Sequence, residues 1–288
     1  MLRRNWSSRD VKDWAGYFKT SVCFVDPLPA GLPYIRGYSL LDMMGRLSYT
    51  EIAFLCIKGR IPSKAEAKVF DTVLSTFIDI ALYRCGIAAA RYNVSGNPQM
   101  STGVATAILG IGKYTVDCAP AGEFIIEKRK EWKASGLPLE AFARKLADLH
   151  VANHWFVPGL GGGERHLDVK KYPGKDPRTG KLWEIVKEEG LIGEHVQLMQ
   201  AIHKTFAVGS ERSHLNINVT GGIGPVLADM GFTPPEMTGV SIMYMIPGTI
   251  AHIVEEMQQN ERIRVVPEFL SEYDKTKRNL EEDLKKRR

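Results

Sequence analysis

The chain has 288 residues, enough to bury one large hydrophobic core or the cores of a large and a smaller domain. Hydrophobic residues make up 44% and charged residues 25%, which is typical of a globular protein in water. The net charge is +5, and residues 275–288 hold seven basic and three acidic residues. The rest of the chain is therefore close to neutral, which argues against a nucleic-acid-binding face.

The four cysteines include no CxxC pair, which predicts reduced thiols rather than a disulfide framework or a metal site. The first residues lack the apolar run of a signal peptide, so we expect a cytoplasmic protein. The longest apolar run, residues 240–254, contains Pro247 and Gly248. It is interpreted as too short and too interrupted to span a bilayer, so no membrane association is expected.

Helix signals dominate the sequence. Ser48 and Glu51 form a capping box, in which each side chain satisfies a backbone amide of the first helical turn. The helix that this box opens is expected to end at Gly59, because glycine adopts the left-handed conformation of a C-cap. Ser63 and Glu66 form a second capping box, followed by apolar residues at helical spacing.

Apolar spacing predicts helices over most of the remaining chain. Residues 102–112 are rich in alanine and glycine, which permits helix backbones to approach closely in a packed core or a dimer seam. Strand signals are weak and confined to short pieces such as residues 263–266. We therefore expect an all-α protein. The other predicted helices cover residues 139–149, 182–206 with a break at 190–193, 226–230 and 240–258.

A glycine-rich segment, PGLGGGERH at residues 158–166, begins the one long irregular stretch. It is neither a P-loop nor a dinucleotide-binding fingerprint, because it lacks Gly-Lys-Ser/Thr and no strand precedes it. Its functional interpretation is close approach of backbone amides to a ligand, and the alternative is an exposed surface loop.

Short motifs in order along the chain carry a family resemblance. They are IRGYSLLD at 35–42, LSYTE at 47–51, KGRIP at 58–62, AR at 90–91, the glycine-rich loop with Asp-Pro-Arg at 157–178, INVTG at 217–221, and AHIVEE with PEF at 251–269. Their order and spacing resemble the citrate synthase superfamily, nearest to its short citryl-CoA lyase-like members.

The resemblance implies a large helical domain and a small one, with boundaries near 1–160, 161–250 and 251–288. It also implies a homodimer that binds an acyl-CoA and a small carboxylate-bearing carbonyl compound, without a metal. In that family a histidine and an aspartate enolise the thioester, a second histidine polarises the carbonyl, and arginines hold carboxylates. Such chemistry needs a positioned base, a donor to the enolate oxygen and planar guanidinium forks.

The sequence departs from the family at its histidines, because none occurs in the first half of the chain. Ungapped counting assigns the first family histidine to Ala81, whereas local similarity assigns it to Cys85. For the second histidine, alignment on Glu123 indicates Cys118 and ungapped counting indicates Val116.

The loop histidine of the family is replaced by Gly162, unless residues 162–165 are an insertion and His166 takes its role. In the INVTG motif Thr220 stands where the family has an aspartate. A threonine hydroxyl cannot act as a base at neutral pH without an activating partner.

Two arginines are candidates for carboxylate binding. Arg178 keeps the family position, whereas the family's C-terminal arginine is Val266, with Arg264 two residues away.

Two functions are consistent with these features. The first is an acyl-CoA-dependent carbon–carbon lyase or synthase, with an altered substrate and a non-standard catalytic set. The second is a catalytically silent paralogue that binds coenzyme A as a structural or regulatory subunit, in a heteromer with an active paralogue. The candidate residues are His166, Asp117, Cys118 and Thr220 for catalysis, Arg178 and Arg264 for substrate, and Gly159, Gly161, Gly162, Lys170 and Lys171 for coenzyme A.

Overall fold

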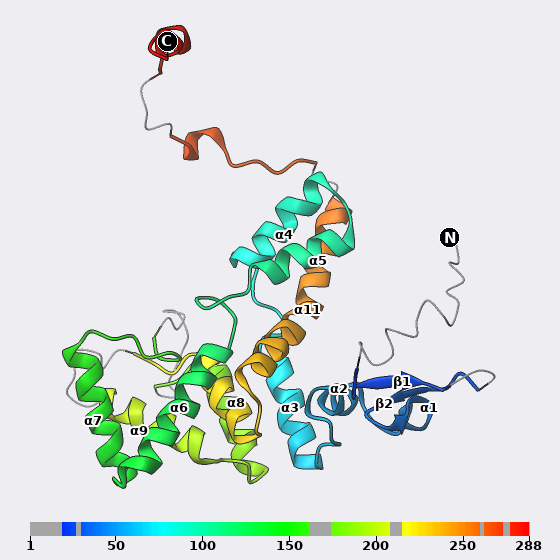
Figure 1. Cartoon of the computed structure of the whole chain (residues 1–288), viewed down its shortest axis with the longest axis vertical. Helices are drawn as coiled ribbons and strands as arrows, with labels where there is room; N and C mark the ends of the chain where they lie inside the picture. The colour runs from blue at the N-terminus through cyan, green and yellow to red at the C-terminus, as the bar shows by residue number, and fades with distance from the viewer. Residues whose placement is uncertain are drawn as a thin grey trace. The chain divides into compact units, whose positions relative to one another are not determined.

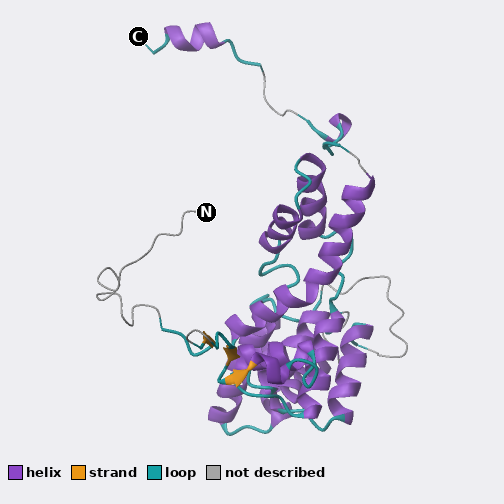
Figure 2. Ribbon diagram, turned by 90° about the vertical axis from the view of Figure 1, so that its right-hand side faces the viewer, coloured by secondary structure: helices purple, strands orange, loops and turns teal. Residues whose placement is uncertain are grey.

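The computed structural model describes residues 19–26, 30–161, 174–207, 215–259, 262–272 and 277–287, and helices dominate it (Figure 1, Figure 2). The predicted all-α fold class is confirmed. A small antiparallel sheet has the strand order β1 (Cys23–Val25), β2 (Pro33–Ile35) and β3 (Tyr38–Ser39). In its register Phe24 lies opposite Tyr34, and their rings stack 4.5 Å apart.

The strand expected at residues 263–266 is wrong. Residues 262–267 form neither helix nor strand, and Ile263 has a φ of +56°, which lies outside the extended region. The three N-terminal strands have only two or three residues each, too few for an alternating pattern to identify them in the sequence.

The described residues divide into two compact units. The first lies within Met1–Ile80 and Ile111–Pro247, and the second lies within Ala81–Gly110 and Gly248–Arg288. The predicted domain boundaries divide the chain at other positions and stay a prediction.

The first unit is built around a buried helix, α10 (Val219–Asp229), in which every residue from Gly221 to Ala228 is buried. Helix α10 packs against α6, α8 and α9, and the indole N–H of Trp183 donates to the carbonyl of Gly222 at 3.0 Å. The unit also contains the sheet, α1 (Leu40–Met43), α2 (Tyr49–Lys58), α3 (Lys64–Thr76), α6 (Ala119–Ser135), α7 (Leu139–Ala152), α8 (Pro177–Glu188), α9 (Glu194–Ala207) and the first part of α11 (Pro234–Gln259).

Both predicted capping boxes are confirmed. The Ser48 hydroxyl accepts from the amide of Glu51 at 3.2 Å, and the Glu51 carboxylate accepts from the amide of Ser48 at 2.8 Å. Ser63 and Glu66 form the same pair of bonds at the start of α3. Helix α2 ends at Gly59, whose φ is +73°, as predicted. Local signals therefore set these helix ends.

The second unit packs two short helices closely together. A Cβ added to Gly86 would lie 2.8 Å from the carbonyl oxygen of Ala107, and one added to Gly103 would lie 2.7 Å from a methyl of Val94. The small residues of this region therefore allow tight helix packing within the unit, while a dimer seam stays a prediction. The unit contains α4 (Cys85–Gly96), α5 (Met100–Leu109), the rest of α11, the 3-10 helix η2 (Glu268–Leu270) and α12 (Leu280–Lys285).

Helix α11 is longer than the predicted helix at 240–258, and it begins at Pro234. Among the described residues it is the one helix long and apolar enough to cross a membrane, with a mean hydropathy of 1.4 over its most apolar window. The interpretation of this run as too short is therefore wrong. A helix of a protein core meets the same criteria, and 39% of that window is buried within the protein, so this is weak evidence for a membrane.

Candidate functional site

Three segments that carry family motifs meet at Ile217 in the first unit. Ile217 forms one isolated β-bridge with Leu160 and another with Lys175. Its amide donates to the carbonyl of Gly174 at 2.9 Å, and its carbonyl accepts from the amide of Asp176 at 2.8 Å. The glycine-rich, Asp-Pro-Arg and Asn-Val-Thr-Gly segments therefore lie side by side, and we call this arrangement the three-segment junction.

Glycines are required in the junction by close backbone packing. A Cβ on Gly159 would lie 2.6 Å from the Cα of Gly221, and one on Gly221 would lie 2.1 Å from the carbonyl oxygen of Gly159. Gly159 and Gly161 both have a positive φ, of +89° and +80°. The Asn218 side chain donates to the carbonyl of Gly161 at 2.9 Å. The described glycines thus pack against the start of α10, and their contact with coenzyme A stays a prediction.

Arg178 lies in the first turn of α8 and is anchored by Asp176, the N-cap of that helix. The guanidinium donates from Nε to Oδ1 at 3.0 Å and from Nη2 to Oδ2 at 2.9 Å. The Asp176 side chain is 2% exposed, whereas that of Arg178 is 36% exposed. The Arg178 guanidinium also lies over the ring of Phe77, with 5.1 Å between Cζ and the ring centroid. This arginine is therefore oriented yet partly accessible, as a carboxylate ligand must be.

Thr220 lies in the first turn of α10, beside the junction. Its hydroxyl donates to the side-chain oxygen of Asn218 at 2.9 Å, and the same oxygen accepts from the amide of Gly221 at 2.8 Å. The hydroxyl therefore supports the helix cap, and these contacts include no basic group that would activate it.

Asp117 lies just before α6 and acts as a local cap. Its Oδ1 accepts from the amide of Ala119 at 2.9 Å, and its Oδ2 accepts from the hydroxyl of Thr238 at 3.0 Å. The hydroxyl of Ser241 also lies 3.3 Å from Oδ1. These bonds fix the carboxylate of Asp117 between α6 and α11.

Cys118 is fully buried, and burial raises the pKa of its thiol to about 12. Its Sγ lies 3.3 Å from the hydroxyl of Ser241 and 3.6 Å from the carbonyl of Met237. A thiol with this pKa is protonated at neutral pH and is neither a base nor a good nucleophile. The structure therefore argues against the predicted acid–base role of Cys118 and favours a packing role.

The two positions that ungapped counting assigns to the family histidines share an unusual backbone. Ala81 has a φ of +68° and Val116 has a φ of +70°. This conformation is uncommon for a residue with a Cβ and a true outlier for a β-branched one, at a cost of about 1–3 kcal/mol. Strained backbone often marks functional positions, so this geometry favours Val116 over Cys118 as the site equivalent. No sequence signal predicts it.

Arg264 belongs to an ion cluster in the second unit. Its Nε donates to Glu256 at 2.5 Å, and Arg91 donates to the other oxygen of the same carboxylate at 2.5 Å. The Glu256 side chain is fully buried. Burial acts to raise the pKa of Glu256, but the hydrogen bonds from Arg264 and Arg91 outweigh it and lower the pKa. Arg264 is thus part of a structural cluster, and its predicted contact with substrate stays untested.

Two further basic residues, Lys175 and His203, lie near the junction. Burial lowers the pKa of Lys175. It also lowers the pKa of His203, with a further contribution from the charge of Lys175, although His203 bonds to the carbonyl of Leu215 at 3.0 Å. Burial and a neighbouring charge shift pKa values at functional sites and in structural ion pairs alike, so these shifts make the two residues candidates for a functional role. Neither residue has a spacing signal in the sequence that would identify it.

Four predicted residues lie outside the described part of the chain: His166, Gly162, Lys170 and Lys171. Within the described part, no group of three or more His, Cys, Asp or Glu side chains could hold a metal ion.

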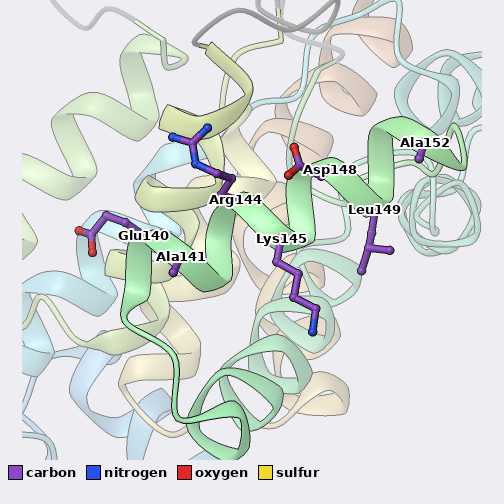
Figure 3. Close-up of a pocket in the computed structure, with 7 residues that line it drawn as sticks. All are labelled: Glu140, Ala141, Arg144, Lys145, Asp148, Leu149 and Ala152. Carbon is purple, nitrogen blue, oxygen red and sulfur yellow. The ribbon is translucent and has the colours of Figure 1, made fainter.

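A surface hollow of about 660 Å³ lies along one helix, α7, and is separate from the predicted site (Figure 3). Its lining mixes both charges with apolar side chains and includes none of the predicted site residues. The lining residues are Glu140, Ala141, Arg144, Lys145, Asp148, Leu149 and Ala152.

Comparison with known proteins finds relatives among solved structures. Citryl-CoA lyase from Hydrogenobacter thermophilus matches with a TM-score of 0.78 and 28% identity, over 93% of this chain and 99% of that chain. ATP citrate lyase from Methanothrix soehngenii, in complex with citrate and coenzyme A, matches with a TM-score of 0.74 and 17% identity, over 98% of this chain and 46% of that chain. Citrate synthase from Thermoplasma acidophilum, in complex with carboxymethyl coenzyme A and oxaloacetate, matches with a TM-score of 0.60 and 17% identity, over 82% and 60% of the two chains. No protein-family model and no curated protein sequence matches the chain.

The fold is therefore that of the citrate synthase superfamily, as the sequence motifs predicted. Within that superfamily it is citryl-CoA lyase-like, because citryl-CoA lyase matches over nearly the full length of both chains, whereas this chain spans about half of ATP citrate lyase.

Proposed function

We propose that the chain is an enzyme that makes or breaks a carbon–carbon bond in an acyl-CoA, in the manner of citryl-CoA lyase or citrate synthase and on an altered substrate. The observation that supports this most strongly is the match with citryl-CoA lyase over 93% of this chain and 99% of that one, at 28% identity. Because a fold alone does not define an activity, the roles of individual residues are argued from their chemistry.

In this proposal the partners are an acyl-CoA and a small carboxylate-bearing carbonyl compound. Arg178 binds the carboxylate, because its planar guanidinium is oriented by Asp176 and partly exposed. Gly159, Gly161, Gly162, Lys170 and Lys171 contribute to coenzyme A binding. Lys175, whose pKa is lowered by burial, adds a cation beside the same junction.

The acid–base groups are the weakest part of the family match. His166 is proposed to polarise the carbonyl compound. Asp117 is the proposed base, and it would have to exchange its bond from Thr238 or Ser241 for the substrate proton. Thr220 contributes hydrogen bonding only, through Asn218.

The second candidate function is a catalytically silent subunit that keeps coenzyme A binding. The observation that favours it is the set of groups at the family's catalytic positions. Val116 and Thr220 carry no basic group, Cys118 has a pKa of about 12, and the Asp117 carboxylate is held by three donors.

The two functions are separated by incubating the protein with citryl-CoA, and separately with acetyl-CoA and oxaloacetate, while free coenzyme A is measured. The enzyme proposal predicts that free coenzyme A is released and that Arg178→Gln greatly reduces this release. Arg144→Gln, an exposed change on α7, should leave the release unchanged. A parallel titration measures coenzyme A binding. Binding without turnover on a panel of acyl-CoA thioesters leaves only the silent subunit.

We further propose a cytoplasmic homodimer, with a heteromer as the alternative for a silent subunit. Light scattering after size-exclusion chromatography, with and without an active paralogue of this chain, measures which assembly forms.

A further inference from the structure

One aromatic ring in the first unit, that of Phe77, contacts two side chains from distant parts of the chain. Phe77 lies directly after α3, and its ring centroid is 5.2 Å from that of Tyr244 on α11, at an angle of 34°. The Arg178 guanidinium lies over the same Phe77 ring at 5.1 Å. We call Tyr244 and Phe77 the aromatic pair.

Tyr244 is buried and held by hydrogen bonds. Tyr244 is 1% exposed, and its hydroxyl bonds to the carbonyl of Val116 and to the hydroxyl of Ser241, the latter at 3.0 Å. Burial raises the pKa of Tyr244 well above its ordinary value, so the phenol stays protonated and remains a donor. Ser241 in turn lies 3.3 Å from Asp117. The aromatic pair is therefore bonded to the Val116–Cys118 segment, in which the missing family histidine is expected.

Arg178 contacts both Asp176 and Phe77. Asp176 accepts two hydrogen bonds from the guanidinium of Arg178, and the same guanidinium lies over the ring of Phe77. The two hydrogen bonds orient one edge of the guanidinium, and the aromatic ring adds a cation–π attraction. Both contacts therefore restrict the orientation of the arginine.

We propose that Phe77 is a positioning residue, which sets the guanidinium of Arg178 for a substrate carboxylate and couples it to the Val116–Cys118 segment through Tyr244. This inference rests on the proposed function, because it takes Arg178 as the carboxylate ligand. It adds that the aromatic pair keeps Arg178 at a fixed position relative to the Val116–Cys118 segment.

The test compares wild-type protein with Phe77→Leu, which removes the ring, Phe77→Tyr, which keeps it, and Phe124→Leu as a matched control. Phe124 is a half-buried aromatic that contacts His150 instead. Two quantities are measured on the full chain: the dissociation constants for citrate and oxaloacetate, and the mobility of the Arg178 Nε–H group by nuclear magnetic resonance, assigned with Arg178→Lys. Thermal unfolding confirms that each variant folds.

We expect Phe77→Leu to increase the mobility of Arg178 and to weaken binding of the two carboxylates about tenfold, as loss of a partly desolvated cation–π contact predicts. Phe77→Tyr and Phe124→Leu should retain wild-type values. If folded Phe77→Leu shows unchanged Arg178 mobility, or unchanged affinity for the two carboxylates, this inference is overturned while the proposed role of Arg178 stands. Wild-type protein that binds neither carboxylate overturns the proposed role of Arg178, and this inference with it.

Discussion

Arg178 and Arg264 have similar exposure and opposite settings. Their side chains are 36% and 34% exposed, and each pairs with a buried carboxylate. Asp176 belongs to the same helix start as Arg178, so that pair is local. Glu256 instead joins Arg264 to Arg91 of α4, so that cluster holds three segments of the second unit together.

The two carboxylates connect different parts of the protein. Around Arg178, backbone hydrogen bonds and close glycine contacts hold the three segments of the junction together. The ion pair between Arg178 and Asp176 lies within one helix start and orients the guanidinium. Around Arg264 the side-chain charges are themselves the framework. Replacing either arginine uncovers a buried carboxylate, but of the two carboxylates Glu256 is the one that two arginines share.

The largest expected effect tests the backbone framework. In Gly221→Ala the new Cβ would lie 2.1 Å from the carbonyl oxygen of Gly159, and only backbone movement can relieve that clash. We expect the free energy of unfolding to fall by about 3 kcal/mol or more, measured by urea denaturation.

Gly239→Ala is the matched control, because Gly239 lies in α11 and a Cβ there would meet nothing within 4 Å. It should stabilise the protein by about 0.5–1 kcal/mol. Equal stability of the two variants would falsify the view that backbone packing builds the junction.

The next effect tests the charge framework. Glu256→Gln keeps the shape of the side chain but leaves Arg91 and Arg264 without their shared charge, so the free energy of unfolding should fall by about 3 kcal/mol. Glu255→Gln, at a position with a 55% exposed side chain, should cost less than about 1 kcal/mol. If the two glutamines cost the same, the cluster does not have the structural role assigned to it.

A third effect contrasts the two arginines in function. Arg178→Lys should lower kcat/KM for coenzyme A release about 100-fold, because lysine cannot reproduce a bidentate fork. Arg264→Lys should change it less than about threefold once folding is confirmed. The reverse order of effects would assign substrate binding to Arg264.

The charge cluster should also depend on pH. The pKa of Glu256 is lowered below its ordinary 4.5 by folding, so its stabilisation is complete above that value and is lost as pH falls through the folded pKa. The stability difference between wild type and Glu256→Gln should be constant from about pH 5.5 to 7.5. Below about pH 5.5 it should shrink, in total by about 1.4 kcal/mol for each unit by which folding lowers the pKa of Glu256. Urea denaturation at several pH values measures it, and a difference that grows in acid would contradict the assigned sign.

The smallest effect concerns Cys118. Cys118→Ala should cost about 1 kcal/mol of stability and change coenzyme A release less than about twofold, because a buried thiol with a pKa of about 12 acts as a small apolar group. Loss of turnover in a folded Cys118→Ala protein would restore its predicted catalytic role.

The sequence by itself determined the local structure and the family of the fold. Ser48, Ser63 and Gly59 act on amides within a few residues, so their patterns predict helix ends without knowledge of the rest of the chain. Motif order also predicted the superfamily fold, and the match with citryl-CoA lyase over nearly the full length of both chains agrees with that order.

Only the tertiary structure decided which candidate residues meet and what each one contacts. Phe77 and Arg178 are 101 residues apart in sequence, Arg178 and Tyr244 are 66 residues apart, and no periodicity links them. The same holds for the burial that raises the pKa of Cys118 and for the positive φ of Val116. Burial, strain and ion pairing depend on neighbours brought together by long-range packing, so a linear pattern can name residue types but cannot assign their partners.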